Sequence, residues 1–176
     1  TWDVGLHYVG GLEPGSATRG LMDLVTEKHA DWAPLTDPLE RLVFPDLELD
    51  LPAGPAALRA RLHDAFPRAK KTVDRCLGHL RRASTWLGAH AAGLDLPGPL
   101  ALLAWGIDRL DEGFSNRTVA AWLDAEVADP RLQSVLGSRW LDWGLPPEHA
   151  ALGIHAMVWT HFLEGASVPV GGAGRI

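Results

Sequence analysis

The sequence is poor in cysteine and in recognisable catalytic motifs. Its single cysteine, Cys76, excludes an internal disulfide framework and fits a reducing compartment, so we expect a cytoplasmic location. A glycine-rich dinucleotide loop after a strand, a P-loop, an H-E-x-x-H pair and a cysteine cluster are all missing. The sequence therefore offers no motif that names a reaction.

Long apolar runs and a strong charge of one sign are missing as well. The longest apolar stretch, residues 96–107, is interrupted by two prolines and a glycine and is shorter than the roughly 20 residues that a membrane span needs. The net charge of −6 is too small to indicate a particular acidic or basic partner for the whole chain.

What is present is the composition of one globular domain with many tryptophans. The chain has 176 residues, of which 47% are hydrophobic and 22% are charged. The chain contains eight tryptophans and only one tyrosine. Indole rings fill protein cores and also line apolar ligand cavities, so either a core or a ligand cavity explains them.

The first third of the chain predicts strands. In residues 2–9, Trp2, Val4, Leu6 and Tyr8 alternate with more polar or smaller residues, which is typical of a strand. Residues 32–37, 41–44 and 47–51 also predict extended chain, with a turn at residues 45–46. Residues 21–26 predict a short helix, and the chain is expected to become extended again from residue 168.

Helical spacing begins after Pro55 and continues to about residue 163. The predicted helices cover residues 58–66, 68–91, 100–110, a segment through 127 that Ser115 or Asn116 caps, a segment from the Asp129 cap to near Gly144, and residues 146–163. The fold class is therefore α+β, with a small mixed or antiparallel sheet followed by a helical layer of about five or six helices. We expect one domain, with residues 1–53 forming the sheet part and residues 54–165 the helical part.

The eight histidines do not predict a metal site. His149, His155 and His161 recur every six residues on one predicted helix, so they point to different faces. His155 and Trp159 are four residues apart and share a face, where they would either line a pocket or form a hydrogen-bonded part of the core. His7 lies on the same strand face as Gly5, where the missing side chain leaves room for a flat group; the alternative is a half-exposed strand histidine.

Half of the basic residues lie within one short stretch. Residues Arg59 to Arg82 contain eight lysines and arginines and two acidic residues, a net charge of +6. A solvated helix surface explains this stretch, and so does peripheral contact with anionic lipid headgroups. Nucleic acid is disfavoured because few aromatic residues lie among the basic ones and the whole chain is acidic.

Three segments of the chain form an ordered set of motifs. The first segment is residues 2–10, with Asp3-Val4-Gly5 followed by His7-Tyr8. The second is residues 41–46 followed by residues 58–67, and the third runs from Trp143 to Ala173. Together they resemble the FAD-dependent phytoene dehydrogenase and retinol saturase family, which includes carotenoid desaturases and isomerases. The segments occur in the family's order and span nearly the whole chain, so the set is more specific than any one motif.

The resemblance implies a parent flavoprotein that holds FAD in a Rossmann-like domain and an apolar polyene in a second domain. The present chain would be the second domain, with residues 166–176 crossing back to the FAD domain. Two features depart from the family. Asp46 is followed by Leu47 where the family usually has glycine, so we expect a differently shaped turn, and the flanking dinucleotide-binding segments are absent.

The resemblance also implies roles for individual residues. FAD would lie near Gly5, His7, Pro169, Gly171 and Gly172, and His7 is the candidate acid or base. The substrate would be lined by Tyr8, Trp105, Trp143, His155 and Trp159.

Three functions stay open from the sequence. The first is the substrate domain of an FAD enzyme that acts on the carbon–carbon bonds of a carotenoid or retinoid. The second is the same fold acting on another apolar or amine substrate. The third is a free-standing helical module that binds a lipid or a protein and uses no flavin. We expect this chain alone to be inactive and to hold FAD weakly, because the phosphate-binding glycine turn is absent.

Overall fold

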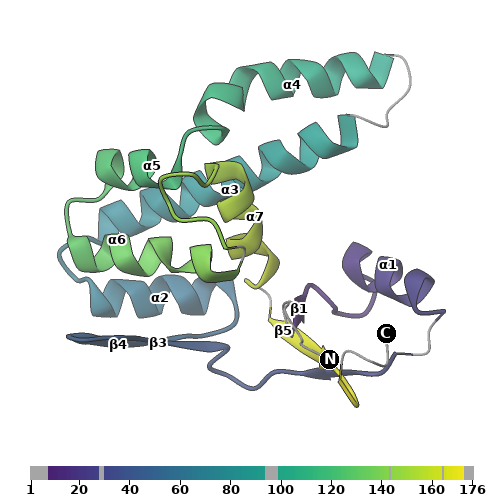
Figure 1. Cartoon of the computed structure of the whole chain (residues 1–176), viewed down its shortest axis with the longest axis horizontal. Coiled ribbons are helices and arrows are strands. Elements are labelled where there is room, and N and C mark those ends of the chain that lie inside the picture. Colours follow the sequence, from purple (N-terminus) through teal and green to yellow (C-terminus); the bar gives the residue numbers. More distant parts are fainter. Residues whose placement is uncertain (1–7, 28–29, 94–98, 143, 164, 173–176) are drawn as a thin grey trace. The chain divides into compact units, whose positions relative to one another are not determined.

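The computed structural model describes residues 8–27, 30–93, 99–142, 144–163 and 165–172. The chain folds into two compact units. Unit 1 consists of residues 1–61 together with residues 161–176, and unit 2 consists of residues 62–160. Unit 1 holds the strands and unit 2 is helical, so the predicted α+β class is confirmed (Figure 1).

A three-stranded antiparallel sheet organises unit 1. Its strand order is β1 (Val9–Gly10), β5 (Ala166–Pro169) and β2 (Trp32–Pro34), so the strand from the far end of the sequence lies in the middle. Val9 pairs with Ser167, and Ala33 pairs with Val168. Residues 2–7 of the strand predicted at residues 2–9 lie outside the described residues.

A two-stranded hairpin forms the second sheet of unit 1. β3 (Glu40–Phe44) pairs with β4 (Leu47–Leu51) in the predicted positions. Leu49 and Leu51 are buried, whereas Asp50 lies opposite Arg41 and accepts a hydrogen bond from its Nε at 2.6 Å. Pro45 and Asp46 make the turn without a positive φ, which explains how Leu47 can replace a turn glycine.

The short helix α1 (Ala17–Val25) begins earlier than the predicted residues 21–26. The cause is Ser16, whose Oγ accepts a hydrogen bond from Arg19 N–H at 3.1 Å and so caps the helix. No residue of α1 is buried, although Leu21, Leu24 and Val25 are apolar.

Unit 2 contains most of the helices. α2 (Pro55–Ala65) crosses from unit 1 into unit 2, and it is followed by α3 (Lys70–Gly93), α4 (Pro99–Ser115), α5 (Val119–Glu126), α6 (Pro130–Gly137), a 3₁₀ helix (Ser138–Asp142) and α7 (Leu152–His161). α3 and α4 pack as an antiparallel pair (Figure 1). The core of unit 2 is formed by apolar residues of α3, α5, α6 and α7, among them Val73, Trp122, Leu132, Val135 and Leu152.

Three predicted helix boundaries are wrong. Ser115 is the last residue of α4, and the cap of α5 is Thr118, whose Oγ1 accepts from Ala121 N–H at 3.2 Å. α4 continues beyond the predicted end at residue 110, because helix interiors tolerate glutamate well and aspartate at modest cost. The α-helix that starts after Asp129 ends at Gly137 and continues only as 3₁₀ turns to Asp142, short of Gly144.

The last helix begins six residues later than the predicted residue 146. His149 and Ala150 donate backbone hydrogen bonds back to the Pro146 carbonyl, so these residues form a turn. Ala151 then forms an isolated bridge with Thr118, and only from Leu152 is the chain helical. A long-range backbone contact therefore overrides the local helix-start signal of Pro146 and Pro147.

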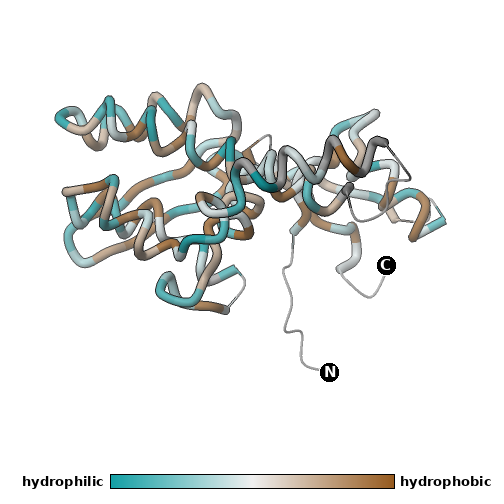
Figure 2. Tube along the Cα trace, turned by 90° about the horizontal axis from the view of Figure 1, so that it is seen from above, coloured by the Kyte–Doolittle hydropathy of each residue, from teal (hydrophilic) through white to brown (hydrophobic). Residues whose placement is uncertain are grey.

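None of the helices in the described part of the chain is long and apolar enough to cross a membrane. Figure 2 shows why, because the colour of the tube changes repeatedly between hydrophilic and hydrophobic along the helices.

A contact between Gly10 and His161 joins the two stretches of sequence that form unit 1. Gly10 N–H donates to Nε2 of His161 at 3.0 Å. A Cβ atom at position 10 would lie 1.9 Å from the His161 carbonyl oxygen, so only glycine fits. The segment that leads into β5 is thereby held against the end of β1.

We expect the Gly10→Ala substitution to lower the free energy of unfolding by about 3 kcal/mol, the cost of forced overpacking at a rigid backbone. Urea unfolding followed by far-UV circular dichroism measures this. The matched control is Gly20→Ala, since nothing lies within 4 Å of a Cβ there and α1 should gain up to about 1 kcal/mol. Equal stabilities of the Gly10→Ala variant and the unmodified chain would show that the contact is looser than described.

Candidate functional site

A glycine turn follows β5 at the edge of unit 1. Pro169 is the last residue of β5 and is buried, whereas Gly171 and Gly172 are exposed and have φ values of +88° and +86°. Gly172 N–H donates to the Pro169 carbonyl at 3.0 Å, which tightens the turn. Two consecutive left-handed residues exclude side chains here, and a Cβ on Gly172 would meet nothing within 4 Å. The turn therefore leaves bare backbone open to a flat group.

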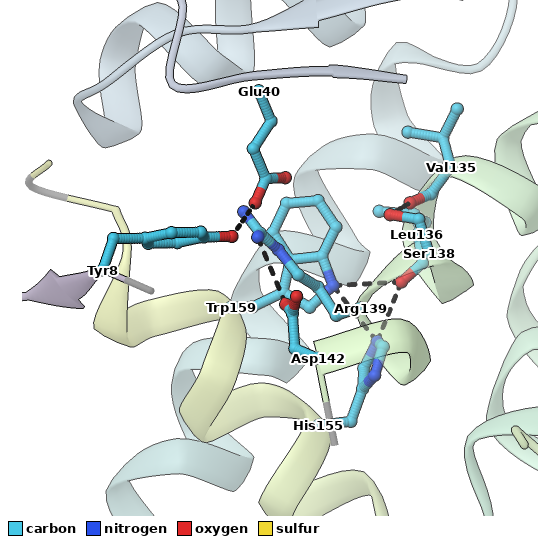
Figure 3. Close-up of polar contacts among 9 residues, drawn as sticks. All are labelled: Tyr8, Glu40, Val135, Leu136, Ser138, Arg139, Asp142, His155 and Trp159. Carbon is cyan, nitrogen blue, oxygen red and sulfur yellow. Dashed lines mark hydrogen bonds and ion pairs between the residues drawn. The ribbon is translucent and has the colours of Figure 1, made fainter. Parts of the chain in front are cut away.

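Tyr8 is the first described residue of the predicted site at the start of the chain. Its hydroxyl donates to Glu40 Oε1 at 2.7 Å (Figure 3). Its ring packs on Phe162 with centroids 4.9 Å apart. Gly5 and His7 lie outside the described residues. The predicted grouping of Gly5 and His7 with Pro169, Gly171 and Gly172 stays a prediction.

His161 carries the nearest described imidazole to this sheet. Burial lowers its pKa, and the carboxylate of Glu13 acts in the opposite direction. Because Nε2 accepts the hydrogen bond of Gly10, the ring must be neutral with its proton on Nδ1. No pattern in the sequence indicates that His161 accepts a backbone hydrogen bond.

A cavity of about 430 Å³ lies within unit 1. Its volume is in the range of small-molecule sites, about 300–1,000 Å³. The loop before α1, β2, β5 and the segments on either side of the hairpin line it: Leu12, Glu13, Pro14, Arg19, Trp32, Pro34, Leu35, Leu39, Ala53, Gly165, Ala166 and Ser167. None of these residues was predicted as a site residue, because they come from six separate stretches of the sequence.

His155 and Trp159 are brought together in the core of unit 2, as their spacing predicts. The Leu136 carbonyl accepts from Trp159 Nε1–H at 3.0 Å and lies 2.8 Å from His155 Nε2 (Figure 3). His155 is fully buried and Trp159 is 2% exposed. The two side chains therefore cross-link α7 to the end of α6.

A buried cation lies beside this pair. Arg139 is 5% exposed, its guanidinium lies 5.2 Å from the centre of the Trp159 ring, and it forms an ion pair with Asp142 at 3.3 Å. Burial lowers the pKa of His155 to about 4, and the charge of Arg139 acts in the same direction. At neutral pH the imidazole is therefore uncharged.

The other predicted lining residues lie in separate parts of the chain. Trp105 is 57% exposed on α4, where Arg109 lies over its ring at 5.2 Å. Trp143 lies outside the described residues. Tyr8 belongs to unit 1, whereas His155, Trp159 and Trp105 belong to unit 2. A common substrate lining by these five residues stays a prediction.

Metal and thiol chemistry find little support among the described residues. No three histidine, cysteine, aspartate or glutamate side chains come together there in a way that could hold a metal ion. Cys76 is buried in α3, and burial raises the pKa of its thiol to about 11. A thiol with that pKa is almost entirely protonated at neutral pH and is a poor nucleophile.

Comparison with known proteins gives a consistent result over the whole chain. The chain is 32% identical to proteins named all-trans-retinol 13,14-reductase from Macaca fascicularis and from Homo sapiens, and 28% identical to the protein of that name from Rattus norvegicus. Each match covers 99% of this chain and 30% of the relative. The resemblance inferred from the sequence motifs is thereby confirmed.

The chain thus spans 30% of the length of the relatives it matches. No family model matches the chain, and no solved structure matches it either.

The buried His155 predicts how stability depends on pH. The pKa of His155 is about 4 in the folded chain and about 6.5 in the unfolded chain, so the unfolded state binds the proton first as the pH falls. The stability from this group is complete above pH 6.5 and decreases by about 3 kcal/mol as the pH falls to 4. Urea unfolding at a series of pH values measures the slope.

The His155→Gln variant should lose most of the slope between pH 6.5 and 4, whereas His149→Gln, at an exposed position, should keep it. Some slope stays in both because burial also lowers the pKa of His161. If His155→Gln does not fold, an NMR titration of the His155 ring in the unmodified chain tests the same point. A ring that titrates near pH 6.5 contradicts the assignment.

Proposed function

We propose, from its homology along 99% of its length with all-trans-retinol 13,14-reductases, that this chain is the substrate-side domain of an FAD-dependent oxidoreductase. The substrate is an apolar polyene of the retinoid or carotenoid type, and the reaction changes one of its carbon–carbon double bonds. The observation that carries the proposal is the alignment of nearly the entire chain with relatives whose name specifies reduction at one bond of a polyene alcohol.

FAD is the cofactor that suits this chemistry. When bound, it supplies hydride exchange with an unactivated carbon, which side chains of this protein cannot supply. The residues that favour the assignment are Pro169, Gly171 and Gly172, because their turn presents backbone without side chains to a flat ring. The chain has no glycine-rich phosphate loop, so it would contact the ring system and leave the pyrophosphate to another domain.

His7 is the group we assign to proton transfer, with Gly5 leaving space beside it. Two described histidines are poor proton donors, which favours His7 for this role. His155 has a pKa of about 4 and His161 is neutral as a hydrogen-bond acceptor, so neither imidazole readily supplies a proton at neutral pH.

The protein also contacts the membrane surface in this proposal, through the basic stretch Arg59 to Arg82. Within unit 2, Arg75 is paired with Glu126 and Arg82 with Asp111. Four further cations of the stretch, Arg68, Lys70, Lys71 and Arg81, are exposed and form no ion pair with any described residue. Exposed cations of this kind are attracted to anionic headgroups at about 1 kcal/mol each.

The function is tested in the longer protein that contains this chain. We expect the purified protein to show flavin absorbance at about 450 nm. With a reductant present, it should lower the absorbance of the conjugated double bonds of all-trans-retinol. His7→Gln should lower kcat by about 100-fold, the typical worth of a general acid or base, and leave the flavin spectrum unchanged. The 176-residue chain alone should show neither flavin nor turnover.

Absence of flavin from the longer protein would favour a helical lipid- or protein-binding module. Flavin without polyene turnover would favour another apolar or amine substrate. Unchanged turnover in His7→Gln would refute the role of His7 alone.

The membrane contact is tested by sedimentation with vesicles. The chain should bind vesicles that contain phosphatidylserine and not vesicles of phosphatidylcholine, and 0.5 M salt should release it because salt screens exposed charges. Lys70→Gln with Lys71→Gln should weaken binding by about 30-fold, since each lysine contributes about 1 kcal/mol, while Arg131→Gln, an exposed arginine outside the stretch, should not. Equal binding to both lipids would refute the contact.

A further inference from the structure

Hydrogen bonds hold several of the segments that line the cavity of unit 1. Ser16 holds the loop wall, since its Oγ donates to the Gly11 carbonyl and accepts from Arg19 N–H. On the opposite side, Leu35 N–H donates to the Ala166 carbonyl at 2.8 Å and continues the pairing of β2 with β5. Backbone and side-chain hydrogen bonds therefore fix the segments that line the cavity.

Most of the lining is apolar. Leu12, Leu35, Leu39, Ala53 and Ala166 come from five different segments, and prolines add further apolar surface. Such a lining accommodates a hydrocarbon and gives little to a strongly polar molecule.

One lining residue carries a polar group that the protein leaves unsatisfied. Trp32 Nε1 is shielded from solvent and has no hydrogen-bond acceptor among the described residues. A buried donor without an acceptor is costly, so few native structures keep one without a reason. The side chain already lines the cavity, and a rotation of the indole ring is what would bring its N–H to an acceptor there.

The charged groups at the cavity favour an uncharged acceptor. Arg19 lines the cavity, but its Nε donates to Asp23 Oδ1 at 2.8 Å and its charge is thereby compensated. Glu13 also lines the cavity and adds a negative charge. Arg19, Asp23 and Glu13 together carry one net negative charge, which disfavours a carboxylate or phosphate ligand.

We infer that this cavity binds the oxygen-bearing end of an apolar alcohol or aldehyde, with Trp32 Nε1–H donating to the ligand oxygen. The site goes beyond the proposed function because residues of unit 1 alone define it. Only the identification of the ligand as the end of a polyene alcohol rests on the proposed function.

The test follows the Trp32 indole N–H signal of the 176-residue chain by ¹H–¹⁵N NMR, with Trp32→Phe identifying the signal. Titration with 1-decanol should shift this signal, and Trp32→Phe should weaken decanol binding by about fivefold, the worth of one neutral hydrogen bond. Trp105→Phe, an exposed tryptophan on α4 far from the lining in sequence, should have no effect.

Decanoate should bind at least about fivefold more weakly than 1-decanol, and Glu13→Gln should remove most of that difference. This second comparison tests the charge argument separately from the Trp32 hydrogen bond, and it needs no change in the core of the protein.

The same titration with all-trans-retinol separates the two proposals. If 1-decanol shifts the Trp32 signal and retinol does not, the site stands and the proposed substrate fails. If retinol binds while the Trp32 signal and the affinity of Trp32→Phe stay unchanged, the site is overturned and the proposed function stands. If no alcohol moves the signal, the site is overturned.

Discussion

Gly10 and His161 meet across 151 positions of sequence, and the sheet of unit 1 is arranged around their contact. The carbonyl of His161 fills the place where a side chain at position 10 would stand, and its ring accepts the backbone hydrogen bond of Gly10. Phe162 follows at once and packs on Tyr8, and β5 then runs between β1 and β2. The cavity lining and the glycine turn both depend on β5, so they depend on this contact as well.

The sequence predicts the elements of this fold well where local pattern decides them. The alternation in residues 47–51 predicts β4, and the apolar stripe of α3 predicts a long helix, because burial of one face is recorded in the spacing of apolar residues. The start of α7 could not be predicted in this way, since Ala151 pairs with Thr118 far away in sequence. The cap of α5 is missed for a smaller reason, namely that several polar residues in a row can each cap a helix.

For the candidate site residues, too, the sequence predicts only what local spacing decides. The spacing of His155 and Trp159 places both on one face, yet it does not reveal that the Leu136 carbonyl and Arg139 would meet them. The cavity has no pattern at all in the sequence, because loop, strand and hairpin segments contribute one to three residues each. The residues proposed near FAD, such as His7 and Gly171, are suggested by resemblance to a family and not by spacing.

The two units differ in the chemistry they can support. The polar groups in the core of unit 2 are held in uncharged or compensated states: His155 has a pKa of about 4, Cys76 has a pKa of about 11, and Arg139 is paired with Asp142. Such groups position helices and do not exchange protons near neutral pH. Unit 1 carries the bare glycine turn and the unsatisfied indole donor of Trp32.

Along the sequence, unit 2 is an insertion in unit 1, because residues 62–160 separate the two stretches from which unit 1 is built. During synthesis on the ribosome the helices of unit 2 emerge complete before β5 exists. Their local contacts form fast, while pairing of β5 with β1 and β2 must close a loop of more than 100 residues and comes late. Until then β1 and β2 lack the strand that joins them, so β5 is the last piece of the sheet to be made and the step that completes unit 1.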